Sequence, residues 1–178
     1  MESDHTSYYS DLDYLLLRDS NLQPLYKGSP EVIHVLKLKI KEGLFTGAKI
    51  LVIGAGGLGC EILKNLALSG FTDITVIDCD SIDVTNLNRQ FLFRMEDIGK
   101  SKAEITAKYI MNRFKGVKVE YHTKRIQEFD IEFYEQFHIV IGGLDNVEAR
   151  RWMNSTLHSM VQFDESQEPI PYTVRVLF

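Results

Sequence analysis

The sequence predicts an α/β domain in which a mostly parallel sheet carries helices on both of its faces. Short β-branched apolar runs alternate with segments of helical periodicity, which is the pattern of such a sheet. The first apolar run leads directly into a glycine-rich loop, and that loop opens a helix. A length of 178 residues with 44% hydrophobic side chains suits roughly one globular domain.

The individual elements follow from local patterns. Residues 1–28 are polar with scattered aromatic side chains, and we interpret them as an N-terminal arm with one short helix at 11–18. Ser29, Pro30 and Glu31 then suit a helix start, because Ser caps, Pro is tolerated in the first turn and Glu complements the helix dipole. Strands are predicted at 49–53, 74–77, 117–121 and 138–141, and helices from Leu58 to Gly70, over 100–114 and over 149–160.

These elements define one domain over residues 29–161, followed by a divergent tail over 162–178. The tail contains one short predicted strand at 172–178. It does not resemble the second half of a doubly wound sheet, so the C-terminal part of that fold is expected to be missing.

Composition and charge exclude several classes of protein. The net charge of −5 disfavours a general role in nucleic-acid binding. No apolar run is long enough to span a membrane, and the polar, acidic N-terminus is unlike a signal or transit peptide. Two cysteines, Cys60 and Cys79, are too few for a disulfide scaffold or a four-cysteine zinc site. A reducing compartment, cytoplasmic or nuclear, is the expectation.

Both cysteines are interpreted as small packing residues. Cys79 is expected to be buried in or just after the second strand, by its pattern. Cys60 stands at the start of the helix after the glycine loop, where the helix dipole could instead lower its pKa.

The strongest motif is the glycine loop. Gly54, Gly56 and Gly59 match the GxGxxG spacing between a strand and a helix, which allows a tight turn, a close approach to phosphate and close helix packing. Asp78 ends the next predicted strand, where a carboxylate would bind ribose hydroxyls. The motif therefore predicts a nucleotide with ribose and phosphates, with NAD as its default.

Residues further along the chain favour a triphosphate over NAD. Arg89 and Lys102 lie in segments expected near the carboxyl ends of the strands, where they could neutralise phosphate oxygens. Asp145 follows the fourth strand and could hold Mg²⁺. Taken singly, each of the two cations is more often a solvated surface charge, and Asp145 is equally suited to cap the next helix.

Together these segments resemble a known family. The runs GAGGLGCE, IDCD, DVTNLNRQFLF, IGKSKAE and GLDNVEARRWMN are similar to the adenylating domain of the ubiquitin-like-modifier-activating enzymes and of their bacterial relatives MoeB and ThiF. The resemblance covers residues 49–161. The runs KNLALSGF, NLNRQFLFR and FYEQFHIVIGGLDN resemble in particular the catalytic subunit of the heterodimeric neddylation-activating enzyme, the Nedd/Rub branch.

The resemblance implies a Rossmann-like, ThiF-type ATP-binding domain and an adenylation. The C-terminal carboxylate of a ubiquitin-like protein would attack the α-phosphate of ATP and release pyrophosphate, with Arg89, Lys102 and Asp145 as the catalytic residues. The implied partners are that modifier, an inert partner subunit that supplies an Arg, and, in full-length relatives, a conjugating enzyme. The implied contacts to ATP and Mg²⁺ are Gly54, Ala55, Gly56, Gly57, Gly59, Asp78 (ribose), Asn86, Arg89, Lys102, Leu144 and Asp145 (Mg²⁺).

The sequence also departs from this family. Full-length members carry a catalytic cysteine well downstream and paired CxxC zinc motifs, whereas no cysteine follows Cys79 here. We therefore expect a truncated or alternatively ended member, a partial gene model or a fragment. Two alternatives stay open: a non-enzymatic remnant that binds nucleotide or the partner subunit, and an NAD-binding Rossmann protein.

Overall fold

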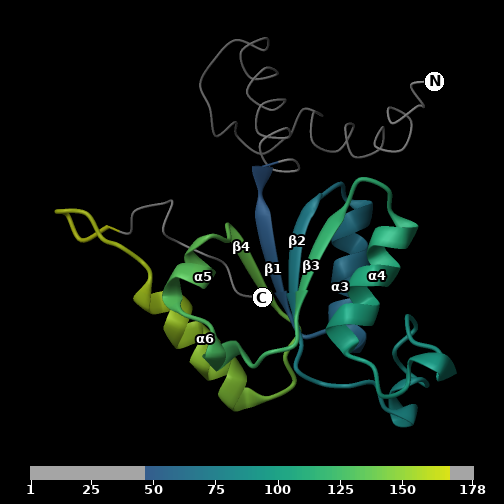
Figure 1. Ribbon diagram of the computed structural model, residues 1–178. Coiled ribbons are helices and arrows are strands. Elements are labelled where there is room, and N and C mark those ends of the chain that lie inside the picture. Colours follow the sequence, from purple (N-terminus) through teal and green to yellow (C-terminus); the bar gives the residue numbers. More distant parts are fainter. Residues whose placement is uncertain (1–46, 169–178) are drawn as a thin grey trace, which may run out of the picture.

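A four-stranded sheet forms the centre of residues 47–168, the part of the chain that the computed structural model describes (Figure 1). Its order is β3-β2-β1-β4, and all three neighbouring pairs are parallel. The strands are β1 (Lys49–Ile53), β2 (Asp73–Ile77), β3 (Lys118–His122) and β4 (Ile139–Gly142). Because the chain moves outward from β1 first to one side and then to the other, the order reverses between β1 and β4. Ligands bind at such a switch point in open α/β sheets.

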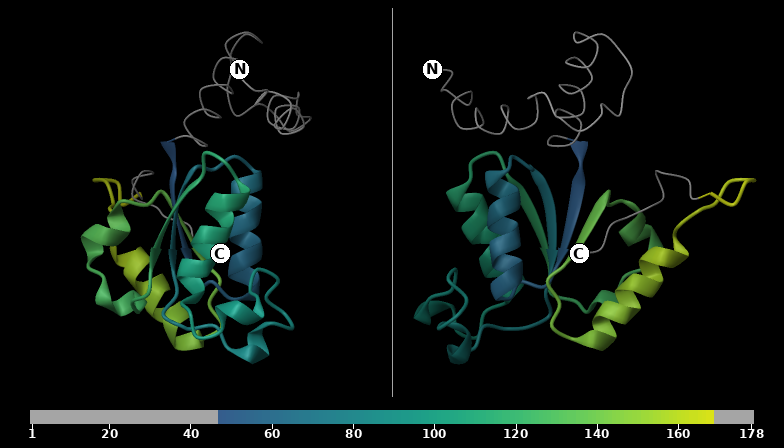
Figure 2. Two further views of the ribbon diagram at one scale, coloured as in Figure 1. Left: turned by 45° about the vertical axis from the view of Figure 1, so that its right-hand side comes forward. Right: turned by 180° about the vertical axis from the view of Figure 1, so that it is seen from behind.

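Helices cover both faces of the sheet, as the two further views show (Figure 2). On one face lie α3 (Gly57–Leu68) and α4 (Lys102–Arg113), and on the other lie α5 (Ile131–Glu135) and α6 (Val147–Ser159). Strand alternation produces the two layers: Ile50 and Val52 pack with α3 and α4, whereas Leu51 and Ile53 pack with α5 and α6. Each core is apolar, and the central strands β1 and β2 are buried on both sides, as expected of a parallel sheet, whereas most residues of the edge strand β3 are exposed.

The connection from β2 to α4 is long but ordered. It contains the short 3-10 helices η1 (Val84–Asn86) and η2 (Met95–Asp97). Its two ends are joined by backbone hydrogen bonds, from the Ile82 N–H to the Lys100 carbonyl and from the Gly99 N–H to the Ile82 carbonyl, each 2.8 Å long. A third small core lies beneath it and consists of the buried residues Cys60, Ile82, Leu92 and Phe93. This connection is therefore a packed unit that can hold side chains in place.

The predicted fold class is confirmed, with boundaries shifted by one or two residues for most elements. The sequence interpretation omitted α5 and the 3-10 helices, including η3 (Ile126–Glu128), because such elements are too short to display a hydrophobic period. The predicted N-terminal arm, the helix from Ser29 and the strand at 172–178 lie outside the described residues.

Candidate nucleotide-binding site

An open cleft of about 1230 Å³ lies at the carboxyl ends of β1, β2 and β4. It is bordered by the glycine loop, by the residues after β2, by η3 after β3, and by the turn into α6 after β4. Eight of the sequence-predicted residues line it: Gly54, Gly56, Gly57, Asp78, Arg89, Lys102, Leu144 and Asp145. Residues separated by up to about ninety positions in the chain are thus brought to one cavity by the parallel strands.

The glycine loop has the backbone geometry that its motif predicts. Gly54 adopts a φ of +98°, in the left-handed region, and a Cβ there would lie 2.7 Å from the Gly143 carbonyl oxygen. A Cβ on Gly59 would overlap with the Gly54 carbonyl oxygen, so α3 can pack here only through glycine. By contrast, a Cβ on Gly56 would meet nothing closer than 4.0 Å, because Gly56 faces the cleft. The N–H groups at the start of α3 consequently border open space.

Asp78 links this loop to the end of β2 through a hydrogen bond. Its carboxylate accepts hydrogen bonds from the Ala55 N–H at 2.6 Å and from the Asp80 N–H at 2.8 Å. Burial raises the pKa of this carboxyl, although the two backbone hydrogen bonds and the Lys102 charge act in the opposite direction. A carboxylate has about four acceptor positions. Two of them therefore stay available for ribose hydroxyls, the role the sequence predicts for Asp78.

Lys102 brings a nearly buried positive charge to the cleft. Its Nζ donates to Asp80 Oδ2 at 2.9 Å, and its side chain is only 11% exposed. It is also the first residue of α4, whose cap is the Ser101 hydroxyl. A cation at a helix N-terminus is disfavoured by the helix dipole, by roughly 0.3–1 kcal/mol. An anionic ligand in the cleft would offset this unfavourable interaction between the Lys102 charge and the helix dipole.

Arg89 and Asn86 have different positions in the β2–α4 connection. Arg89 lines the cleft, is exposed, and donates from Nη1 to the Thr85 carbonyl at 2.8 Å. Asn86 is buried and is not among the cleft-lining residues, since its Oδ1 accepts the Asp83 N–H at 2.9 Å. Its carbonyl accepts the Arg89 N–H at 3.1 Å. In the described structure Asn86 therefore orders the loop that carries Arg89.

Asp145 and Leu144 line the cleft where β4 turns into α6. The expectation that Asp145 could cap α6 is wrong. The cap is Asn146, whose Oδ1 accepts from the Glu148 N–H at 2.8 Å and the Ala149 N–H at 3.2 Å. Asp145 is exposed and has no capping hydrogen bond, so its carboxylate is available to a ligand in the cleft.

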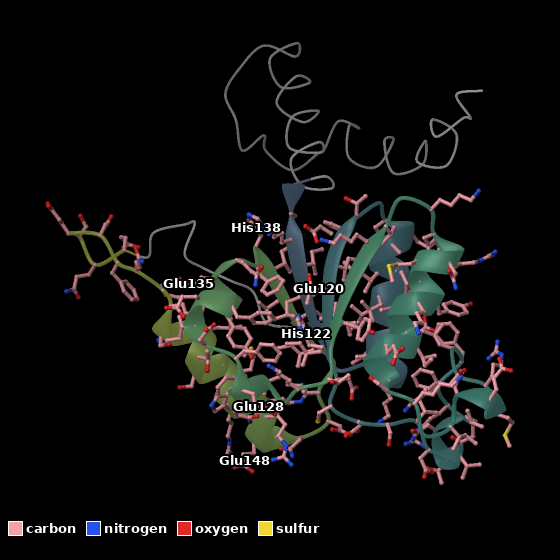
Figure 3. The ribbon with its side chains drawn as sticks, in the orientation of Figure 1. Glu120, His122, Glu128, Glu135, His138 and Glu148 are labelled. Carbon is pink, nitrogen blue, oxygen red and sulfur yellow. The ribbon has the colours of Figure 1, made fainter. Side chains whose placement is uncertain are left out.

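Two predicted residues lie beneath the cleft, and several unpredicted ones line it. Ala55 and Gly59 are buried and are not among the lining residues. Figure 3 shows Glu128 and Glu148 at the cleft end of the molecule, contributed by η3 and α6. The other charged or amide side chains that sequence reasoning missed are Asp80, Gln90, Lys124, Arg125, Gln127, Asn146 and Arg150. Position after a strand was the available signal for the residues following β2 and β3.

The two cysteines differ from the expectation in one respect. Cys60 is buried, as expected, and burial raises the pKa of its thiol to about 11, so the helix dipole does not make it acidic. Cys79, however, is exposed and lines the cleft, so its expected burial is wrong. Strand β2 ends at Ile77, and the two residues that follow turn outward into the cleft. Desolvation and two nearby aspartates also raise the pKa of Cys79.

Two features are absent from residues 47–168. No group of three or more His, Cys, Asp or Glu side chains that could hold a metal ion by itself occurs in this range. None of the helices in the same range is long and apolar enough to cross a membrane.

Curated relatives share much of this sequence. The NEDD8-activating enzyme E1 catalytic subunit of Dictyostelium discoideum is 53% identical over 154 residues, which are 86% of this chain and 33% of the relative. The corresponding subunit of Arabidopsis thaliana is 48% identical over 166 residues, or 93% of this chain and 35% of the relative. The chain thus spans about a third of the length of these relatives.

Solved structures from Escherichia coli have a similar fold. The Escherichia coli tRNA N6-threonylcarbamoyladenosine dehydratase TcdA is 26% identical with a TM-score of 0.63, covering 77% of this chain and 54% of its own. Escherichia coli MccB is 28% identical with a TM-score of 0.59, covering 70% of this chain and 38% of its own. The ThiF family model matches residues 38–162, which include the sheet, the glycine loop and every predicted site residue. By sequence, fold and cleft, the chain belongs to the ThiF family.

Proposed function

We propose that this chain carries the ATP site of a ubiquitin-like-modifier-activating enzyme of the Nedd8/Rub type. One observation carries the proposal: the glycine loop, Asp78, Arg89, Lys102 and Asp145 line a single cleft at the switch point of the sheet. The relatives named NEDD8-activating enzyme catalytic subunits support the type of modifier.

The residues suit adenylation of a carboxyl group, which needs positioned reactants and neutralised charge but no protein nucleophile. The N–H groups at the start of α3 would face a phosphate. Arg89 and Lys102 would neutralise phosphate oxygens, and Asp78 would hold the ribose. Leu144 would border the nucleotide from the β4 side. The modifier's terminal carboxylate would then attack the α-phosphate, and pyrophosphate would leave.

Mg²⁺ fits the donor set at one position. Mg²⁺ in nucleotide sites is usually held by one or two carboxylates, with substrate phosphates and water completing its coordination. Asp145 is an exposed carboxylate in the cleft without a capping role, which meets this need. When bound, the ion would neutralise charge on the phosphates.

A partner subunit and the conjugating pathway belong to this proposal. In the family the chain resembles, an inert subunit supplies a further Arg to the phosphates and full-length relatives recruit a conjugating enzyme. Apolar side chains exposed on the β2–α4 connection, such as Val84 (55%) and Met95 (70%), are consistent with a covered surface there. The low cysteine count supports a reducing location, in the cytoplasm or nucleus.

Calorimetric titration of the chain with ATP, with and without Mg²⁺, and with NAD tests the nucleotide. We expect Mg²⁺-dependent ATP binding that is tighter than NAD binding. Lys102→Met should weaken ATP binding roughly 10- to 150-fold, because a hydrogen bond to a charged group contributes about 1.5–3 kcal/mol. Lys108→Met is the matched control, since Lys108 is an exposed lysine on the same helix that pairs with Glu104. Tighter binding of NAD than of ATP would overturn the assignment.

Pyrophosphate exchange tests the enzymatic step. With the modifier and partner subunit present, the chain should exchange labelled pyrophosphate into ATP. ATP binding without exchange under these conditions would favour a nucleotide-binding protein that is not an enzyme.

A further inference from the structure

Gln90 is a buried residue at the cleft with a polar atom that lacks a hydrogen-bond partner. It is only 4% exposed, yet it lines the cleft. Its Oε1 is buried and has no hydrogen-bond partner among the described residues. A buried carbonyl oxygen without a partner costs free energy and is uncommon in folded proteins. None of the roles assigned above to the cleft residues uses this side chain.

The surroundings place the Gln90 amide beside the glycine loop. Its Nε2 lies 4.0 Å from the position that a Cβ on Gly56 would occupy, and its Cγ lies 3.9 Å from the corresponding position on Gly57. The Gln90 backbone is fixed, because its N–H donates to the Asn86 carbonyl at 2.9 Å and its carbonyl accepts the Phe93 N–H at 3.2 Å.

The unsatisfied atom is an acceptor, so the ligand that satisfies it must carry an N–H or O–H group. The triphosphate of ATP has no such donor at neutral pH, and the adenine amine lies at the opposite end of the nucleotide from the phosphates that the glycine loop would face. The ribose hydroxyls do, but the carboxylates of Asp78 and Asp80 in the same cleft are stronger acceptors for them. A carboxyl-terminal peptide brings both kinds of group, since its last amide N–H lies beside its terminal carboxylate.

We propose that Gln90 orients the carboxyl-terminal peptide of the modifier. Its Oε1 accepts the last peptide N–H, and its Nε2 donates to a carboxylate oxygen of the terminal residue. The inference rests on the proposed function, because it requires a carboxyl-terminal peptide as substrate. The neutral amide holds the peptide next to Gly56 and Gly57 and leaves phosphate neutralisation to Arg89 and Lys102. Gln90 therefore governs the affinity for the modifier and not that for ATP.

Steady-state pyrophosphate exchange by the full chain with its partner subunit tests whether Gln90 acts on the affinity for the modifier and not on that for ATP. Gln90→Met keeps the side-chain length and removes both hydrogen-bonding groups. We expect the KM for the modifier to rise about tenfold, the effect of roughly 1.4 kcal/mol, with the KM for ATP within twofold of wild type. Gln136→Met is the control, because Gln136 is exposed on α5 and does not line the cleft. A raised KM for ATP with an unchanged KM for the modifier, or no change in either, overturns the inference.

A second experiment observes the Gln90 side chain in the wild-type protein and does not require catalytic turnover. In the ¹⁵N-labelled wild-type chain, the side-chain amide signals of Gln90 are followed by NMR and assigned by their loss in Gln90→Met. A short peptide with the modifier's carboxyl-terminal sequence, added in the presence of Mg²⁺ and a non-hydrolysable ATP analogue, should shift them. The same peptide methylated on its last amide nitrogen has lost the N–H and should shift them much less.

The outcomes separate this inference from the proposed function. If the chain binds no ATP, the proposed function fails and the inference fails with it. If the chain binds ATP and the peptide but the Gln90 signals do not move, the inference alone fails. Equal shifts with both peptides, or a full shift on adding the ATP analogue alone, also overturn it, the latter because Gln90 would then serve the nucleotide.

Discussion

At the scale of single residues, Asp145 and Asn146 have separate roles at the start of α6. Asp145→Ala should weaken Mg²⁺–ATP binding and leave the melting temperature within about 1 °C of wild type, because Asp145 makes no capping hydrogen bond. Asn146→Ala removes the cap and should cost about 1 kcal/mol of stability, or roughly 3 °C. Calorimetry measures both effects. A fall in melting temperature for Asp145→Ala without loss of ATP affinity would contradict the ligand role.

The two thiols should differ in reactivity. Cys79 is exposed at the cleft, whereas Cys60 is fully buried. A thiol reagent at pH 8 should therefore modify one cysteine in the native chain and two in denaturant. Mg²⁺–ATP should slow the modification of Cys79, because Cys79 lines the cleft. Mass spectrometry of the labelled peptides identifies the site. Rapid native labelling of Cys60 would contradict its buried position.

Cys60 also predicts a loss of stability at high pH. Burial raises its pKa from 9.0 to about 11 in the folded chain. Between these values the unfolded chain loses the thiol proton while the folded chain keeps it, so the unfolded state becomes favoured as pH rises. Stability from this group is complete below about pH 9 and is lost by about pH 11, by on the order of 2 kcal/mol. Urea midpoints measured across this range should fall.

The matched variant for this alkaline effect is Cys60→Ala. It should be less stable at neutral pH, because a packed side chain is lost. Its stability should nevertheless decline less between pH 9 and pH 11 than that of wild type. Burial also raises the pKa of Tyr134, whose hydroxyl donates to the Ile126 carbonyl, so part of the decline should persist. An identical decline in both proteins would exclude Cys60 as a cause.

At the scale of elements, the packing of α3 on β1 depends on one glycine. A Cβ on Gly59 would overlap with the Gly54 carbonyl oxygen, so Gly59→Ala must displace the helix or the loop. We expect a cost of about 1–3 kcal/mol in stability and loss of ATP binding. Gly56→Ala is the matched change, because its Cβ would make only an ordinary van der Waals contact, 4.0 Å from Gln90 Nε2, and its φ of −76° suits alanine. Gly56→Ala should keep wild-type stability and lose only ATP affinity, as denaturant titration and calorimetry would show.

At the scale of the whole molecule, the chain should not form a thioester with the modifier. A thioester needs a thiolate that reaches the adenylated carboxyl group, and the pKa of both cysteines is raised. Cys60 is buried, Cys79 lies beside the expected ribose position, and no cysteine lies between residues 80 and 178. Incubation with modifier, partner subunit and Mg²⁺–ATP, followed by a non-reducing gel, is the assay. A modifier adduct that disappears on adding thiol would refute the expectation.

The local pattern of this sequence was sufficient to predict the strands, the main helices and the glycine loop. A strand that is buried on both faces has a continuous run of apolar, β-branched residues in its sequence. A helix that packs on a sheet has apolar residues at helical spacing. The positive φ of Gly54 and the close packing at Gly59 also follow from the motif, because only glycine tolerates both. Short elements such as α5 leave no such period and were not predicted.

Only the tertiary structure decided which side chains share the cleft. The parallel strands carry their carboxyl ends to one edge, so residues from η3 and α6 join the glycine loop. The position of η3 after a strand was the one signal for this in the sequence, and residue type did not indicate it. The same assembly assigns the cap of α6 to Asn146, exposes Cys79 and turns Asn86 inward to the Asp83 N–H. The two hydrogen bonds join residues only two or three positions apart, but residue type alone does not decide which of several neighbouring groups comes within about 3 Å. The sequence by itself determined the fold class and the nucleotide motif, whereas the folded structure determined which local hydrogen-bond partners are used, and long-range packing determined the burial of each site residue.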